Sequence, residues 1–232
     1  MSFVGVGAAE GANSSCSGAL VGRHHVITAA HCIFIRAQDG NPAFWRNYEL
    51  RVGRNGSEWW DHASMATGWR WFWVEAAYYD AALNGGSPAE WDIGMVIFPD
   101  RHIGSQTGWM GWTYSNTSHD DIYNRSYPSC GGSAPPPNCQ PGHMYGPPDS
   151  CNSGYFSSQK DSYGYSLYGF HSCDTSGGQS GSALYRGNAV RGVHKGIHHH
   201  ASNNDDGDPN QSFALVTRDR SDVINYFLSL YP

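Results

Sequence analysis

His31, Asp92 and Ser180 are three side chains whose types could cooperate in covalent catalysis, although they lie far apart in the sequence. A serine hydroxyl is a weak nucleophile and needs a base within hydrogen-bond reach. An imidazole can act as that base near neutral pH, and a carboxylate can orient the imidazole and stabilise its charged form. Each residue alone has an ordinary structural explanation, but together they could transfer an acyl group through a covalent intermediate on the serine.

Glycines surround the serine, since Gly177 and Gly178 precede Ser180 and Gly181 follows it. Because glycine has no Cβ, it allows a tight turn and a close approach of substrate to the backbone. Backbone N–H groups in such a turn can point into one concavity and bind a developing oxyanion. This segment is therefore a candidate nucleophile loop.

The sequences around these three residues are similar to those of trypsin/chymotrypsin-like serine proteases. The histidine closes the block at residues 28–32 (TAAHC), the aspartate opens residues 92–94 (DIG), and the serine lies in residues 178–182 (GQSGS). The chain order His, Asp, Ser is that of chymotrypsin. The resemblance spans roughly residues 16–230, which is nearly the whole chain.

The resemblance implies a role for each residue. His31 would be the general base, Asp92 would orient it, and Ser180 would be the nucleophile. The N–H groups of Gly178 and Ser180 would form the oxyanion hole. The implied activity is peptide-bond hydrolysis through an acyl-enzyme.

Gln179 departs from the digestive members of this family, which carry an aspartate there to pair with a new N-terminal ammonium group. Glutamine followed by Ser-Gly-Ser resembles the glutamyl endopeptidase branch. In that branch a histidine on the next strand and a threonine or serine five residues before the nucleophile bind the substrate glutamate. The resemblance thus implies His194 and Thr175 as substrate-binding residues, and such groups form charge-assisted hydrogen bonds with a carboxylate. The expected substrates have Glu or Asp on the acyl side of the scissile bond.

Two alternatives stay open. Asp174 lies six residues before Ser180, where trypsin-type members keep the aspartate that attracts Arg or Lys, so the same triad could serve a trypsin-like preference. A chain with this fold could also be a non-catalytic secreted binding homologue, although the complete set of three residues argues against this. Lys195, beside His194, is expected to lie at a solvated strand end.

Six cysteines and no C-x-x-C motif favour three disulfides formed in an oxidising compartment. A bridge between Cys16 and Cys32 would fix the backbone at His31. The other four can pair in three ways, which the sequence leaves open. They are Cys130, Cys139, Cys151 and Cys173.

The cysteines and five N-x-S/T sequons predict a secreted protein, although residues 1–4 (MSFV) do not resemble a signal peptide. We therefore expect that a signal and propeptide have been removed or that the chain is truncated. The sequons would permit glycosylation in a eukaryotic source. Their asparagines are Asn13, Asn55, Asn116, Asn124 and Asn210.

The composition excludes several classes of partner. Charged residues make up 15% of the 232 residues, and 14 basic against 20 acidic residues give a net charge of −6. Without a basic tract, binding to a nucleic acid backbone is not expected. No apolar run approaches the roughly 20 residues of a membrane-spanning helix. We expect protein or peptide substrates, a monomer, and no cofactor.

A metal site is not expected either. Residues 198–200 are three histidines, followed by Asp205, Asp206 and Asp208. Consecutive strand residues point to opposite faces, so the three histidines cannot share one site. The acidic stretch also lacks the bidentate glutamate of a calcium loop. We expect a solvated loop here.

Short β-prone segments separated by turn signals run through much of the chain. Residues 223–231 differ, because their apolar side chains form one stripe at helical spacing, with Asp219 or Ser221 as the N-cap. Residues 126–162, rich in Pro, Gly, Ser and Cys, predict disulfide-pinned surface loops. His24 and His25 are expected in a turn. The expected strands are residues 25–30, 49–54, 68–79, 91–98, 182–185, 189–193 and 212–216.

The predicted fold is therefore all-β, with two packed antiparallel six-stranded β-barrels of the chymotrypsin type and a C-terminal α-helix. Residues 1–100 would form the N-terminal barrel, which carries His31 and Asp92. Residues 101–232 would form the C-terminal barrel, which carries Ser180, the specificity pocket and the terminal helix.

Overall fold

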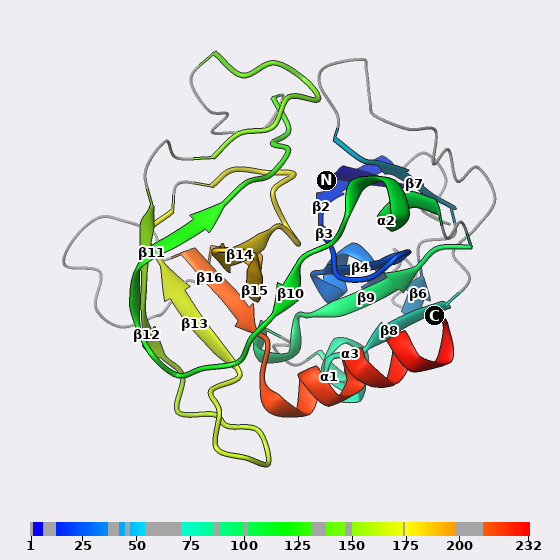
Figure 1. Ribbon diagram of the computed structural model, residues 1–232. Helices are drawn as coiled ribbons and strands as arrows, with labels where there is room; N and C mark the ends of the chain where they lie inside the picture. Colours follow the sequence, from blue (N-terminus) through cyan, green and yellow to red (C-terminus); the bar gives the residue numbers. More distant parts are fainter. Residues whose placement is uncertain are drawn as a thin grey trace.

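The protein is mostly β, with a long helix at its C-terminal end (Figure 1). Among the residues described, no helix is both long and apolar enough to cross a membrane. The structure is a computed structural model, and it describes residues 2–6, 13–36, 42–44, 47–53, 71–85, 89–99, 102–130, 138–146, 150–173, 175–197 and 211–232.

The second half of the chain forms one closed ring of six strands, which confirms the predicted antiparallel barrel there. The ring closes because β15 pairs with β14 on one side and with β16 on the other. A further short strand, β10 (Gly111–Trp112), adds to β15 in parallel, which the sequence did not predict. In ring order the strands are β11 (His119–Asn124), β12 (Cys151–Phe156), β13 (Tyr168–His171), β16 (Gln211–Leu215), β15 (Ala189–Ile197) and β14 (Ala183–Arg186).

The first half consists of three separate sheets in the part of the chain that the structure describes, so a second closed ring is not seen. Several of these strands have only two or three residues and therefore share few ladder hydrogen bonds with a neighbour. One sheet contains β3 (Ala19–Leu20), β4 (His25–Thr28), β9 (Gly94–Ile97) and β8 (Trp71–Val74). The others contain β2 (Asn13–Ser17), β1 (Ser2–Val6) and β7 (Asn47–Arg51), and β5 (Phe34–Arg36) with β6 (Pro42–Phe44).

The helices differ in part from the prediction. The single strand expected at residues 68–79 ends early, because α1 begins at Ala76 and runs to Asn84. Alanines favour a helix there, and Gly85, with a φ of 74°, terminates it in the left-handed conformation. A second helix, α2 (His102–Thr107), was not expected.

The terminal helix α3 (Arg218–Leu230) confirms the prediction, although its N-cap is Thr217. The Thr217 hydroxyl accepts a hydrogen bond from the Arg220 N–H. Asp219 and Ser221, the two expected caps, lie within the first turn instead.

One hydrophobic core joins the two halves and the terminal helix. Ile27 on β4 and Met95 on β9 pack with Val193 on β15, Ala214 on β16 and Ile224 on α3. Burying a valine, isoleucine or methionine side chain stabilises the fold by about 1.5–3 kcal/mol. Figure 1 shows α3 lying across the strands of the first half. Residues from both halves are therefore held at fixed positions relative to one another.

Three disulfides join the six cysteines, and Cys16–Cys32 confirms the predicted bridge. The others are Cys130–Cys139 and Cys151–Cys173. Residues 126–162 are not only surface loops, because Cys151 begins β12 and is buried in a further hydrophobic cluster, with Ile122 and Leu184. His24 lies in the bend between β3 and β4, as predicted, but the turn prediction is wrong for His25, which belongs to β4, and both side chains are buried.

Candidate active site

His31 and Asp92 form a tightly bonded pair. The chain leaves β4 at Thr28 and enters a short 3-10 helix, η1 (Ala30–Cys32), which carries His31 and is pinned by the Cys16–Cys32 bridge. Asp92 follows a second short 3-10 helix, η2 (Ala89–Trp91). Its Oδ2 lies 2.7 Å from His31 Nδ1, and its Oδ1 accepts the His31 backbone N–H at 2.9 Å.

This two-point contact fixes both the position and the tautomer of the imidazole. An ionised carboxylate can only accept hydrogen bonds, so Nδ1 must carry a proton. In the neutral ring Nε2 is then the free acceptor, which is the atom that a general base uses. Asp92 is buried and His31 is partly exposed, so the far side of the ring remains reachable.

The pair also sets the ionisation of both groups. Burial alone would lower the pKa of the His31 imidazole, but the charge and hydrogen bond of Asp92 outweigh burial and raise that pKa above its usual value. Burial alone would raise the pKa of the Asp92 carboxyl, but the contacts with His31 hold it below its usual range. Asp92 is therefore an anion, and His31 is an imidazole of increased basicity.

Backbone hydrogen bonds bring the Ser180 loop against the segment that precedes His31. The Ser180 carbonyl accepts the N–H of Ser17 at 2.8 Å, and Ser17 follows Cys16, whose disulfide leads to Cys32 beside the imidazole. Both residues belong to the described part of the chain, where no hydrogen bond joins the Ser180 hydroxyl to His31. Such a bond is commonly long without substrate and shortens when a substrate binds.

The peptide unit between Gly177 and Gly178 is held in one orientation by a backbone hydrogen bond. The Gly177 carbonyl accepts the Ser129 N–H at 2.6 Å. Because a trans peptide is planar, its N–H points away from its carbonyl, so the Gly178 N–H faces the opposite side. Gly178 has a φ of 87°, and a Cβ there would lie 2.6 Å from the Ser129 nitrogen, so only glycine fits.

Gln179 is buried and is held by neutral side chains. Its Oε1 accepts hydrogen bonds from Ser176, and its Nε2 donates to the Ser126 hydroxyl. Ser126 donates to Asn124 Oδ1 at 3.0 Å, and Asn124 Nδ2 donates to Ser182 at 2.8 Å. The Ser180 loop is thus fixed without a charged partner. Asn124, one of the sequon asparagines, is fully buried, so it cannot accept a glycan in the folded protein.

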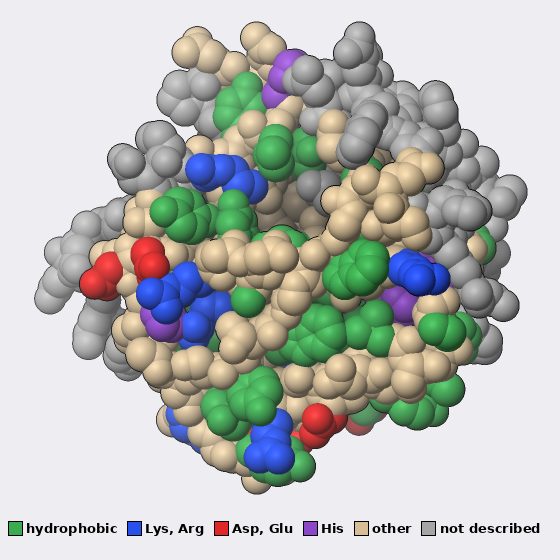
Figure 2. Space-filling model, in the orientation of Figure 1, with side chains coloured by type: hydrophobic (Ala, Val, Ile, Leu, Met, Phe, Trp, Pro, Cys, Tyr) green, Lys and Arg blue, Asp and Glu red, His purple; other side chains and the backbone are tan. Residues whose placement is uncertain are grey.

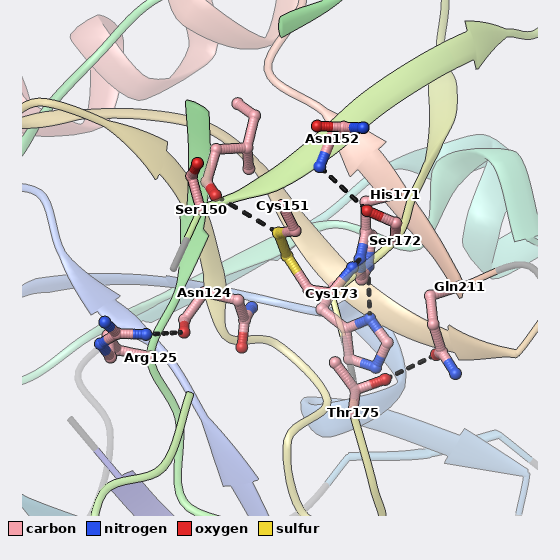
Figure 3. The surroundings of a disulfide bond; sticks show 12 residues. Asn124, Arg125, Ser150, Cys151, Asn152, His171, Ser172, Cys173, Thr175 and Gln211 are labelled. Atoms are coloured by element: carbon pink, nitrogen blue, oxygen red, sulfur yellow. Dashed lines mark hydrogen bonds between the residues drawn. A yellow bond between two sulfur atoms is a disulfide. The ribbon is translucent and has the colours of Figure 1, made fainter. Parts of the chain in front are cut away.

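His194 and Thr175, the expected substrate-binding residues, each contact a residue that the sequence did not single out. Thr175 donates to Gln211 Oε1 at 2.6 Å, and His194 Nδ1 lies 3.1 Å from His171 Nε2. Figure 3 shows the side chains of Thr175, Gln211 and His171 grouped beside the Cys151–Cys173 disulfide. Gln211 connects the two contacts, because its backbone is paired with His171 in β13.

Hydrogen bonding assigns the protons of the two buried histidines. The Cys173 N–H donates to His171 Nδ1 at 3.2 Å, so the neutral His171 ring carries its proton on Nε2. That proton is donated to His194 Nδ1, which leaves the neutral His194 ring with its proton on Nε2. Burial lowers the pKa of His194 to about 3, and the nearby His31 adds to this effect. Burial and His194 likewise lower the pKa of His171 well below its usual value.

Lys195 does not lie at a solvated strand end, so that expectation is wrong. The side chain is half-buried, and its Nζ donates to the Ala89 carbonyl at 2.6 Å. Lys195 therefore contacts the short helix that leads into Asp92.

Several expectations fall on residues outside the described ones. Asp174 is among them, as are residues 198–200 and the three acidic residues Asp205, Asp206 and Asp208. Among the described residues, the one cluster with metal-ligand types is Cys16, His31 and Cys32. Both sulfurs of this cluster are bound in a disulfide and are not thiolates, so the cluster does not fit a metal ion.

A cavity of about 570 Å³ lies between β3 and β14, where Figure 2 shows a hollow between the two halves. It is lined by residues that include Leu20, Trp109, Arg125 and Tyr185. His31, Asp92 and Ser180 do not line it, so it is separate from the candidate site.

Solved serine proteases have a similar overall structure. No protein-family model matches the sequence, and no curated protein matches it. A Glu endopeptidase solved in complex with MPD is 17% identical, with 98% of this chain and 90% of that chain covered and a TM-score of 0.62. The thermostable serine protease AL20 from an extremophilic microorganism is 18% identical, with coverages of 98% and 95% and a TM-score of 0.64.

A third solved structure, the protease Anisep from Arthrobacter nicotinovorans, is 16% identical, with coverages of 98% and 94% and a TM-score of 0.60. At these identities the likeness concerns the fold. The closed barrel, the sheets of the first half and the terminal helix are therefore arranged as in chymotrypsin-fold serine proteases.

Proposed function

We propose that the protein is a serine endopeptidase that hydrolyses peptide bonds through an acyl-enzyme on Ser180. The observation that carries this proposal is the His31–Asp92 pair, in which one buried carboxylate binds both the ring and the backbone N–H of the histidine. The likeness of the fold to solved serine proteases supports it.

In the proposed reaction the Ser180 hydroxyl attacks the substrate carbonyl while its proton moves to His31 Nε2. The negative charge that develops on the carbonyl oxygen would be stabilised by the N–H groups of Gly178 and Ser180. His31 then gives the proton to the leaving amine, and an ester remains on Ser180. A water molecule, activated by the same imidazole, would hydrolyse that ester.

Asp92 has two functions in this proposal. Its hydrogen bonds hold His31 with Nε2 as the acceptor, and its negative charge stabilises the imidazolium ion that forms in each step. Because its pKa is held low, Asp92 stays ionised throughout the neutral pH range. Because the pKa of His31 is raised, activity should need a pH above the ordinary imidazole pKa of about 6.5.

We propose that the substrate residue on the acyl side of the scissile bond is Glu or Asp. The assigned tautomers leave His194 with an Nε2–H donor, which suits a carboxylate acceptor, and Thr175 can supply a hydroxyl. The pocket would then bind an anion with neutral donors, and the arriving carboxylate would favour a proton on His194. The likeness to a solved Glu endopeptidase supports the same preference.

The disulfides support an oxidising environment, so we propose that the protein is secreted and acts on other proteins or peptides. We also propose that the predicted division near residue 100 separates the two catalytic halves, with His31 and Asp92 on one side and Ser180 on the other.

Cleavage of a denatured protein mixture, with the cut sites identified by mass spectrometry, tests both parts of the proposal. Cuts after Glu or Asp that disappear in the Ser180→Ala variant are expected. Cuts after Arg and Lys would agree with the triad assignment, but they would assign the specificity to Asp174. Identical cuts by wild type and Ser180→Ala would contradict Ser180 as the nucleophile. A folded wild type that makes no cuts would favour the non-catalytic binding homologue.

A further inference from the structure

Lys195 lies close enough to Asp92 for its charge to act on the carboxylate, and it belongs to β15, the strand that also carries His194. Its ammonium group donates to the Ala89 carbonyl at 2.6 Å and lies 4.6 Å from the centre of the Tyr168 ring. A cation over an aromatic face is attracted by the negative face of the ring. The carbonyl and the ring thus hold the ammonium group in one place, although a lysine side chain is otherwise flexible.

The carbonyl that Lys195 binds belongs to η2, which leads straight into Asp92. The next carbonyl of this helix, that of Glu90, accepts a hydrogen bond from Arg220 at 2.8 Å. Arg220 is almost fully buried on α3 and also forms an ion pair with Glu75. Two cations from different elements therefore hold two successive carbonyls of the segment that sets the position of Asp92.

Lys195 also places a positive charge near the pair. Burial lowers the pKa of the Lys195 ammonium to about 8, and Arg220 adds to this, whereas Asp92 and Glu90 oppose it. Lys195 directly follows His194 on β15, and the aromatic ring beside its ammonium group, that of Tyr168, belongs to β13. Lys195 in turn lowers the pKa of both Asp92 and His31.

We propose that Lys195 is a positioning residue for the His31–Asp92 pair, which fixes η2 through Ala89 and supplies a cation near the carboxylate. The proposal rests on the serine endopeptidase function, because it assigns Lys195 a task at that site. Two separate effects should follow from its removal. Loss of the hydrogen bond would let Asp92 move, and loss of the charge would make the imidazole more basic.

The chain offers a matched control, because it contains only two lysines, Lys160 and Lys195. Lys160 is exposed on the loop between β12 and β13, where its ammonium group contacts Ser157 and Ser166. Lys160→Met removes the same charge from the chain without touching η2. Lys195→Arg keeps the charge, and Lys195→Gln is a second neutral variant in case Lys195→Met does not fold.

Two measurements compare these variants. The first is NMR titration of the His31 ring, which needs no catalytic activity. The second is kcat and KM for a Glu-containing peptide as a function of pH. In Lys195→Met we expect His31 to titrate at higher pH and kcat to fall roughly tenfold, with KM nearly unchanged. Lys195→Arg should keep the wild-type titration, and Lys160→Met should change neither quantity.

The proposal is overturned if the neutral Lys195 variants titrate His31 at the wild-type pH and keep wild-type kcat. The proposal is also overturned if Lys160→Met changes the pH at which His31 titrates by the same amount. The change would then come from the net charge of the protein and not from the position of Lys195. If the protein is not a protease, the two measurements would give a different result. The wild type would cleave no peptide, while the His31 titration would still report whether Lys195 acts on the pair.

Discussion

Two of the hydrogen-bonded histidine pairs among the described residues, His31–Asp92 and His194–His171, differ in the partner of the imidazole. In the first, His31 contacts the carboxylate of Asp92 at 2.7 Å, and its pKa is raised. In the second, His194 contacts the imidazole of His171 at 3.1 Å, and both pKa values are lowered. Burial acts in the same direction in both pairs, so the partner decides the outcome.

The difference gives the two histidines opposite chemical abilities. An imidazole bonded to an anion can take up a proton, as a general base must. An imidazole bonded to another neutral ring stays neutral and keeps one fixed N–H donor. His31 is thus suited to move protons and His194 to bind an acceptor, although both have the same side chain.

Replacing the anion of the first pair should have the largest effect. Asp92→Asn removes the charge that raises the pKa of His31 and allows the wrong tautomer, because an amide can donate to Nδ1. We expect kcat to fall about 10⁴-fold. Steady-state hydrolysis of a Glu peptide measures the loss, and NMR titration should show the His31 pKa decreasing. An Asp92→Asn variant with nearly wild-type kcat would contradict the role of Asp92.

Replacing the donor of the second pair should change specificity more than turnover. His194→Leu removes the Nε2–H that we assign to the substrate carboxylate. We expect kcat/KM for a Glu peptide to fall about 100-fold, because a charged group is left without a partner, whereas a matched Gln peptide should lose much less. Equal losses for both peptides would show that His194 does not recognise the charge.

How far the sequence predicts these features depends on how local they are. His31, Asp92 and the Ser180 loop lie in short motifs that are recognisable by themselves, and the structure brings the first two together. The placement of the Ser180 hydroxyl for attack remains a prediction, as does the substrate preference. His171 was missed, because its contact with His194 joins residues 23 positions apart on different strands.

The sequence also left the pairing of four cysteines open and did not predict α1. The β12–β13 register opposes Ser153 to His171, and the same register opposes Cys151 to Cys173, so strand pairing chose between disulfide patterns that the sequence left open. At α1, the aromatic β-prone residues that precede it concealed the change from strand to helix at Ala76.

A smaller effect is expected from replacing His171, which donates a hydrogen bond to His194 in the second pair. His171→Leu removes the donor to His194 Nδ1, so the His194 proton is no longer fixed on Nε2. We expect KM for a Glu peptide to rise about tenfold while kcat changes little. His171→Gln can again donate to His194 Nδ1 and should recover part of the loss. If His171→Leu leaves KM unchanged, the tautomer of His194 does not depend on His171.

His25 extends the comparison to a buried imidazole without an anion or a second imidazole hydrogen-bonded to its ring. It is 1% exposed, and neither ring nitrogen has a hydrogen-bond partner among the described residues. Burial lowers its pKa to about 4, and the neighbouring His24 adds to this, whereas the backbone of Phe227 opposes it. Below about pH 6.5 the unfolded chain binds a proton that the folded chain resists, so stability should decrease as the pH falls from about 6.5 to 4.

His25→Leu should remove this part of the acid sensitivity. We expect a weaker decrease of the unfolding free energy between about pH 6.5 and 4, by on the order of 1 kcal/mol, measured by denaturant unfolding at several pH values. An identical pH dependence in wild type and His25→Leu would contradict the assignment.

The most direct test of the central claim is labelling of the folded protein with a fluorophosphonate, which reacts with activated serines. The modified residue would be mapped by mass spectrometry, and the rate would be followed from about pH 5 to 9. We predict modification at Ser180, with a rate that rises with pH as His31 loses its proton and that is abolished in His31→Ala. A folded protein whose Ser180 stays unmodified, or is modified equally fast without His31, would contradict the account.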